Sequence, residues 1–150
     1  MLKKSVMMVL FAALSVSAFA VQAKTVEIEG TNSLRFSQET ITVKPGEEVT
    51  IKLSNNTKLP AAAMAHNWVL LASGADAHKL DQAAMNAKSN DYIPMDMDDQ
   101  IIAHTGLVAG GESDTITFTA PEEPGDYEYI CTFPGHFAAG MKGTLTVKAE

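Results

Sequence analysis

The chain has 150 residues, of which 46% are hydrophobic and 19% are charged, and its formal net charge is −7. This length accommodates one compact domain, and the balance of apolar and charged residues excludes a disordered or fibrous protein. A single cysteine, Cys131, excludes an internal disulfide framework, a cysteine-rich zinc site and an iron–sulfur cluster.

The first segment has the pattern of a secretory signal. Two lysines precede the uncharged run 5–20, which is shorter than the roughly 20 residues that span a bilayer, and small residues follow it. Cleavage after Ala20 or after Ala23 fits, and we favour Ala23 because a strand-like pattern begins directly after it. We therefore predict a signal peptide at 1–23 and one domain at 24–150, exported to the periplasm with no membrane insertion after cleavage; an uncleaved anchor is the alternative.

Charge limits the partners of the exported domain. Without the signal, nine basic and eighteen acidic side chains remain, a net charge of −9. Nucleic acid and anionic lipid are poor partners for such a surface, which favours a basic or weakly charged protein partner, although charge of this size also serves plain solubility. An unpaired cysteine in an oxidising compartment has to be buried or bound to something.

Alternation of apolar and polar residues dominates the mature chain, as in half-buried strands. The alternating apolar positions are Val26/Ile28, Ile41/Val43, Val49/Ile51/Leu53, Ile116/Phe118 and Leu145/Val147. Glycine, proline and asparagine mark the breaks between these segments, as expected for turns. We predict an all-β fold, a Greek-key β-sandwich or barrel of seven to eight short antiparallel strands.

One segment departs from this alternation. Residues 75–87 are rich in Ala, Leu, Met and Lys, and their apolar members, including Leu80 and Ala84, recur at helical spacing. This segment lies between predicted strands around 68–71 and 101–102. We predict a short helix within an insertion that is too long for a simple hairpin.

The strongest motif lies near the C-terminus, where Cys131, His136 and Met141 occur with four residues in each gap. A predicted strand at 126–131 precedes these residues and another at 143–148 follows them. Each gap is long enough to reverse the chain, and a proline–glycine pair and a later glycine supply the bends. The three side chains can therefore return to one metal ion.

The best fourth donor is His66. Alternation places His66 and Trp68 on one strand face, and it places Tyr129 and Cys131 on one face of another strand. Both donors then point into one end of the sandwich. Two imidazoles, a thiolate and a weak thioether form the ligand set of a mononuclear blue-copper site; zinc accepts the same donors, but structural zinc sites rarely use a thioether.

The sequence resembles the cupredoxin family, and within it the azurin and auracyanin-like members, over nearly all of 24–150. The most specific parts are His66-Asn67-Trp68, Ile102-Ala103-His104-Thr105, Gly111-Glu112-Ser113 and the segment 131–145. This resemblance implies a plastocyanin-like fold with one type 1 copper. It also implies equatorial ligation by His66, Cys131 and His136 and axial ligation by Met141.

The same resemblance implies further roles. Asn67 is expected to connect the strand of His66 to the ligand loop by hydrogen bonds near Thr132. His136 is expected near the surface, in an apolar patch with residues 137–139. Azurin has a glycine where this sequence has Ala65, so a fifth contact from that backbone oxygen is not expected, and we predict a four-coordinate site.

The function that follows is transport of single electrons between larger redox proteins, by a protein that is not an enzyme. Cys131 and His136 on one tight loop offer neither the cleft nor the oxyanion hole of a cysteine hydrolase. A c-type cytochrome, a quinol-oxidising complex and a terminal reductase are all compatible partners. A monomer is expected, because electron carriers work through brief encounters.

The alternative is a periplasmic protein that binds or handles copper without redox turnover. Met64, Met95 and Met97 favour it weakly, because clustered thioethers bind Cu(I), but the acidic surroundings of the last two are typical of a solvated loop. His78 and His104 are expected to be solvent-exposed and to bind no metal.

Overall fold

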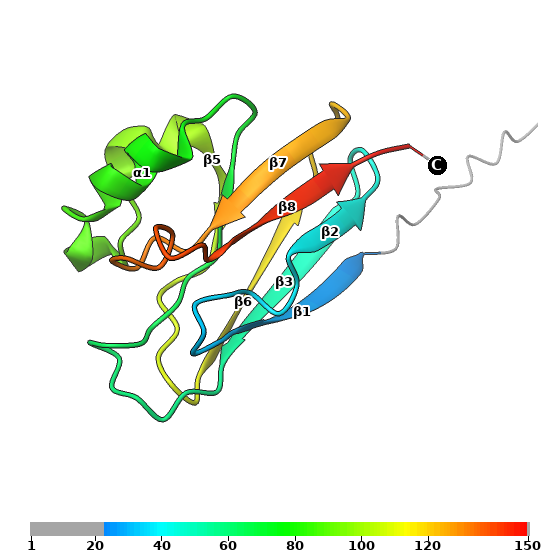
Figure 1. The fold of residues 1–150 in the computed structure, drawn as a ribbon. Coiled ribbons are helices and arrows are strands. Elements are labelled where there is room, and N and C mark those ends of the chain that lie inside the picture. The colour runs from blue at the N-terminus through cyan, green and yellow to red at the C-terminus, as the bar shows by residue number, and fades with distance from the viewer. Residues whose placement is uncertain (1–22, 150) are drawn as a thin grey trace, which may run out of the picture.

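Residues 23–149 are described by the computed structural model, and they form two β-sheets packed face to face with a helix beside one of them (Figure 1). The predicted signal peptide lies outside the described residues, apart from Ala23. Within this part of the chain, no helix has both the length and the apolar character required to cross a bilayer.

The two sheets differ in size. The smaller has the order β1-β3-β6, with β1 at Lys24–Gly30, β3 at Glu48–Asn55 and β6 at Ser113–Thr119. The larger has the order β2-β8-β7-β4-β5, with β2 at Thr40–Val43, β8 at Lys142–Val147, β7 at Gly125–Ile130, β4 at Val69–Leu71 and β5 at Ile101–His104. The predicted all-β sandwich is therefore confirmed.

The expectation of purely antiparallel strands is wrong for two pairs. β1 pairs with β3 in parallel, and β2 pairs with β8 in parallel. The chain reverses direction between β1 and β2 and again between β2 and β3. Because β2 belongs to the other sheet, β1 and β3 become neighbours that run the same way.

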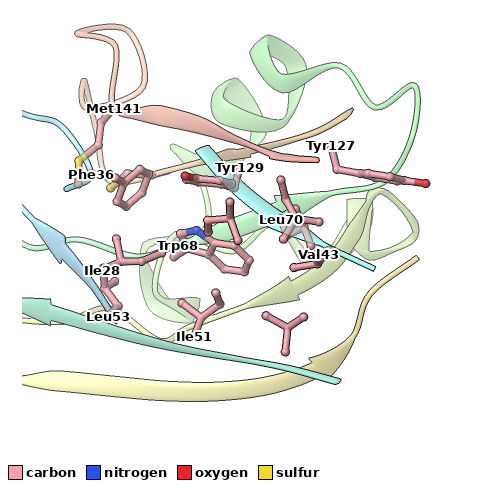
Figure 2. Close-up of a cluster of buried hydrophobic side chains, with 14 of the residues drawn as sticks. Ile28, Phe36, Val43, Ile51, Leu53, Trp68, Leu70, Tyr127, Tyr129 and Met141 are labelled. Atoms are coloured by element: carbon pink, nitrogen blue, oxygen red, sulfur yellow. The ribbon is translucent and has the colours of Figure 1, made fainter. Parts of the chain in front are cut away.

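Alternation within β4 and β7 divides the buried residues into two groups. The sandwich core lies between the sheets and includes Trp68, Leu70, Tyr129 and Cys131, as well as Met141. Figure 2 shows this core, with Met141 and Phe36 toward one end and Tyr127 toward the other. The helix-side cluster lies on the outer face of the larger sheet and consists of Val69, Leu71, Ala77, Leu80, Ile93, Ile130 and Phe137.

The predicted helix is present as α1 at Ala77–Ala84. Asp76 caps it, because its side chain accepts hydrogen bonds from the backbone N–H groups of His78 and Lys79, both at 3.1 Å. The rest of the insertion contains two short 3₁₀ helices, η1 at Lys88–Asn90 and η2 at Met95–Gln100, which the sequence did not predict. The apolar face of α1 covers the helix-side cluster, next to the loop that joins β7 and β8 (Figure 1).

Candidate metal centre

The four predicted donors are all buried, and they come from chain segments at the ends of strands. His66 precedes β4 and forms an isolated bridge with Val108, with backbone hydrogen bonds of 3.1 and 2.7 Å. Cys131 directly follows β7, and Met141 directly precedes β8. His136 lies between them and is 4% exposed, whereas the other three donors are fully buried.

Three donor atoms converge. The Nδ1 atoms of His66 and His136 are 3.2 Å apart, and the Sγ atom of Cys131 lies 3.6 Å from the Nδ1 atom of His136. All three donor atoms lie within 4.8 Å of one another, and no other group of three histidine, cysteine or acidic side chains in 23–149 does so. The predicted equatorial donors are therefore gathered at one point.

The loop from Cys131 to Met141, here called the ligand loop, is closed by its own backbone. The N–H of Cys131 donates to the carbonyl of Met141 at 3.1 Å, and the N–H of Met141 donates to the carbonyl of His136 at 2.9 Å. The N–H of His136 donates to Phe133 at 3.0 Å. These bonds tie the three predicted donors of the loop to one another through the main chain.

A side-chain network connects the ligand loop to the segment of His66. The Asn67 side chain donates to the Thr132 hydroxyl at 2.8 Å and accepts from the Thr132 N–H at 2.8 Å, which confirms the expected contact. The Asn67 amide also donates to the carbonyl of Asp91 at 2.9 Å, and the Thr132 hydroxyl donates to the carbonyl of Tyr92 at 2.7 Å. The insertion thus supports the centre from outside, which the sequence did not predict.

The two supporting carbonyls come from a strained piece of backbone. Asp91 and Tyr92 have positive φ angles of 54° and 60°, a region that residues other than glycine rarely occupy. Such strain persists only where surrounding contacts hold it in place. The hydrogen bonds from Asn67 and Thr132 are such contacts. Aspartate tolerates this region better than most residues, whereas nothing in the local sequence predicts it for Tyr92.

Gly30, at the end of β1, lies against the imidazole of His66. A Cβ atom on Gly30 would lie 2.5 Å from Cδ2 and 2.7 Å from Cγ of that ring, closer than non-bonded atoms approach. The absence of a side chain therefore makes room for the ring. The sequence shows a glycine shortly after the alternating positions Val26 and Ile28, but it does not identify the neighbour of that glycine in space.

Burial keeps the imidazoles neutral and the thiol protonated in the metal-free centre. Burial, with a smaller contribution from nearby His136, lowers the pKa of His66 to about 4, and burial also lowers the pKa of His136. Burial raises the pKa of Cys131 to about 12, despite hydrogen bonds from the backbones of Asn67 and Phe133. Near neutral pH, both imidazoles therefore have free lone pairs, and a metal has to displace the thiol proton.

This donor set fits a single copper ion. Imidazole nitrogen and thiolate sulfur bind such metals at about 2.0–2.3 Å, so tetrahedrally arranged pairs of donors lie roughly 3.3–3.6 Å apart. The observed separations of 3.2 and 3.6 Å agree with these values.

The structure corrects one expectation about the surroundings of His136. Phe137 does not line a surface patch; it is 6% exposed and belongs to the helix-side cluster. Its ring contacts the ring of His78 on α1, with the centroids 5.0 Å apart. The residue packs under the helix because it follows His136 and points to the opposite side of the loop.

The remaining candidate residues do not join the centre. His78 and His104 are exposed, as expected, and neither belongs to the group of converging donors. Met95 is 61% exposed, whereas Met97 packs against the helix-side cluster. These two methionines therefore present their side chains to different environments.

A β-sandwich with two imidazoles, one thiol and a buried methionine gathered at one end is the architecture of a mononuclear copper protein of the cupredoxin class. The chain belongs to the plastocyanin/azurin family of copper-binding proteins, whose family model matches residues 22–148. Copper is therefore its metal.

Similar proteins include both azurins and auracyanins. Azurin from Pseudomonas aeruginosa is 37% identical over 151 residues, which cover 99% of this chain and 100% of that protein. Azurin from Alcaligenes faecalis is 41% identical over 123 residues, covering 80% and 94%. The structure of auracyanin A, a "blue" copper protein from Chloroflexus aurantiacus, is similar with a TM-score of 0.76 and 38% identity, covering 85% of this chain and 100% of that one.

Proposed function

We propose that this protein is a periplasmic carrier of single electrons rather than an enzyme, with one copper held closely by His66, Cys131 and His136 and weakly by Met141. The observation that carries this proposal is the convergence of two imidazole Nδ1 atoms and a thiol inside the protein. A thiolate between two imidazoles, with a distant thioether, is the donor set of a blue-copper electron-transfer centre. The names of the azurin and auracyanin relatives support the same function.

Bound copper supplies a one-electron couple between Cu(I) and Cu(II). The protein's part is to hold the donors in nearly the same positions in both oxidation states. The backbone closure of the ligand loop and the bonds between Asn67 and Thr132 serve this purpose, because they fix the two segments that carry Cys131 and His66. A site that rearranges little exchanges electrons quickly.

His136 is the proposed route for the electron. His136 is 4% exposed, and Pro134, Ala138 and Ala139 of the same loop are exposed. Small uncharged side chains permit close approach and rapid separation, as brief redox encounters require. A c-type cytochrome, a quinol-oxidising complex or a terminal reductase is the proposed partner class for a monomeric carrier formed by 24–150 after cleavage of 1–23.

The first experiment is a visible and electron paramagnetic resonance spectrum of 24–150 loaded with Cu(II) and then reduced by ascorbate. An intense blue band with narrow copper hyperfine splitting, bleached reversibly, is expected from the thiolate–copper bond. Cys131→Ser is the matched control, since it replaces only sulfur by oxygen, and it should lose the band completely. A full band in that variant would refute the thiolate assignment.

Met141→Leu tests the axial role. The side chain keeps nearly the same volume, so the fold should be retained, while the reduction potential changes more than copper retention does. Complete loss of copper from this variant would show that Met141 is more than a weak axial ligand.

Uptake of copper by the wild type without the blue band would favour copper handling over electron transfer.

A further inference from the structure

Arg35, the one arginine in the chain, bridges two loops that are far apart in the sequence. It lies between β1 and β2, and its Nη1 atom donates to the carbonyl of Ala139 in the ligand loop at 2.7 Å. The same atom donates to the carbonyl of Leu34 at 2.8 Å. The guanidinium also lies against Gly140, where a Cβ atom would come within 3.1–3.2 Å of its Nη1, Cζ and Nη2 atoms.

The loop that carries Arg35 is itself well fixed. The N–H of Thr31 donates to the carbonyl of Arg35 at 2.9 Å, and the N–H of Leu34 donates to the carbonyl of Thr31 at 3.0 Å. Leu34 has a positive φ of 57° and packs against the sandwich core. Arg35 therefore extends from a hydrogen-bonded turn anchored to the core.

On the other side, Arg35 reaches the part of the ligand loop between His136 and Met141. The backbone N–H groups there are used inside the loop, since Gly140 donates to Phe137 at 2.8 Å and Met141 donates to His136 at 2.9 Å. The Ala139 carbonyl faces out of the loop and accepts from the guanidinium. The contact thus fixes the peptide unit that directly precedes Gly140.

Gly140 allows this contact in two ways. Its φ of +100° is a conformation that residues with a side chain rarely adopt, and its bare backbone lets the planar guanidinium lie flat against it. Lysine lacks the planar group that lies against Gly140. Arginine is therefore the side chain that this geometry fits.

We propose that Arg35 is a positioning residue for the copper centre: it holds the second half of the ligand loop, between His136 and Met141, and places a fixed positive charge beside it. This inference rests on the proposed ligand set. A nearby cation disfavours Cu(II) relative to Cu(I), so Arg35 also raises the reduction potential. Position and charge can be separated, because lysine keeps the charge and loses the bridge.

The test uses Arg35→Met, which removes both charge and bridge, and Arg35→Lys, which removes the bridge alone. Lys52→Gln is the control, since it removes a positive charge that pairs with Glu27 on the smaller sheet. Amide hydrogen exchange of the metal-free protein should accelerate about tenfold at Gly140 and Met141 in both Arg35 variants, and not in the control. In the copper-loaded proteins, the reduction potential should be lower in Arg35→Met than in the wild type, and the decrease should be smaller in Arg35→Lys.

Exchange rates within twofold of wild type in both Arg35 variants would overturn the proposal. A double-mutant cycle gives a second test, in which Gly140→Ala is introduced into the wild type and into Arg35→Met. The strain at the φ angle of residue 140 is present in both proteins, but the collision of the new methyl group with the guanidinium occurs only in the wild type. Gly140→Ala should therefore destabilise the wild type more than it destabilises Arg35→Met. Equal losses would also overturn it. A wild-type protein without the blue band would reject the ligand set instead, and the exchange data on the metal-free protein would still report on the bridge.

Discussion

The sandwich core and the helix-side cluster share the strands β4 and β7 but support the copper centre in different ways. Cys131 and Met141 belong to the sandwich core, which is enclosed by two hydrogen-bonded sheets. Phe137, next to His136, belongs to the helix-side cluster, which is covered by α1 and its loops. One part of the centre is thus held between two hydrogen-bonded sheets, while the other packs under a single short helix.

Leu70 and Leu80 allow a matched test of this difference, because both are fully buried, one in each cluster. Leu70→Ala is expected to lower the free energy of unfolding by about 4 kcal/mol, and Leu80→Ala by about 2 kcal/mol, since α1 can move into the cavity and the sheets cannot. Chemical denaturation of the metal-free proteins measures both values. Equal losses would mean that the helix-side cluster is as rigid as the sandwich core.

Gly30→Ala tests the close packing of the sandwich core against a proposed ligand. The new methyl group would lie 2.5 Å from the His66 ring, so the ring has to move. We expect a loss of about 3 kcal/mol in stability together with weaker copper binding. Gly106→Ala is the control, since its nearest neighbours would be carboxylate oxygens at 3.4 and 3.5 Å, and it should retain copper.

His66 makes the stability of the metal-free protein depend on pH. Its pKa of about 4 in the folded state lies below its ordinary value of 6.5, so at intermediate pH the unfolded chain binds a proton that the folded chain does not. Stability should therefore fall from pH 7 to pH 4, with about 3 kcal/mol of the fall due to His66. Unfolding free energies across this range should fall less steeply for His66→Gln. If the free energy of unfolding falls equally with pH in the wild type and in His66→Gln, His66 is not the group that causes the pH dependence.

Replacing Asp81 on α1 is expected to give the smallest change in the free energy of unfolding. This change should be stabilising, whereas most substitutions destabilise a protein. One of the Asp81 carboxylate oxygens is buried without a hydrogen-bond partner among the described residues, and burial raises its pKa despite the attraction of His78. Its ionised form destabilises the fold above the ordinary pKa, so Asp81→Asn should gain less than about 1 kcal/mol at pH 7 and nothing near pH 3. Asp76→Asn is the contrast: hydrogen bonds hold the pKa of this helix cap low, so that variant should lose stability at pH 7.

Much of the centre could be predicted because its signals are local. The gaps between Cys131, His136 and Met141 fall within one loop, and alternation places His66 and Cys131 on inward-facing positions. The prediction failed at Phe137, which was expected at the surface. The direction in which the Phe137 side chain points is set by its packing against α1, a segment about 50 residues earlier in the chain. No pattern within the ligand loop predicts that contact.

The sequence by itself determined the strands, the short helix, the sandwich class and a set of donors for one copper, because side-chain alternation and turn residues act over a few positions. Only the tertiary structure decided that β1 joins β3 in parallel, that Gly30 lies against His66, and that Arg35 and the carbonyls of Asp91 and Tyr92 support the centre. These contacts join segments tens of residues apart. Their partners are chosen when the two sheets and the insertion pack together, and local preferences carry no information about that choice.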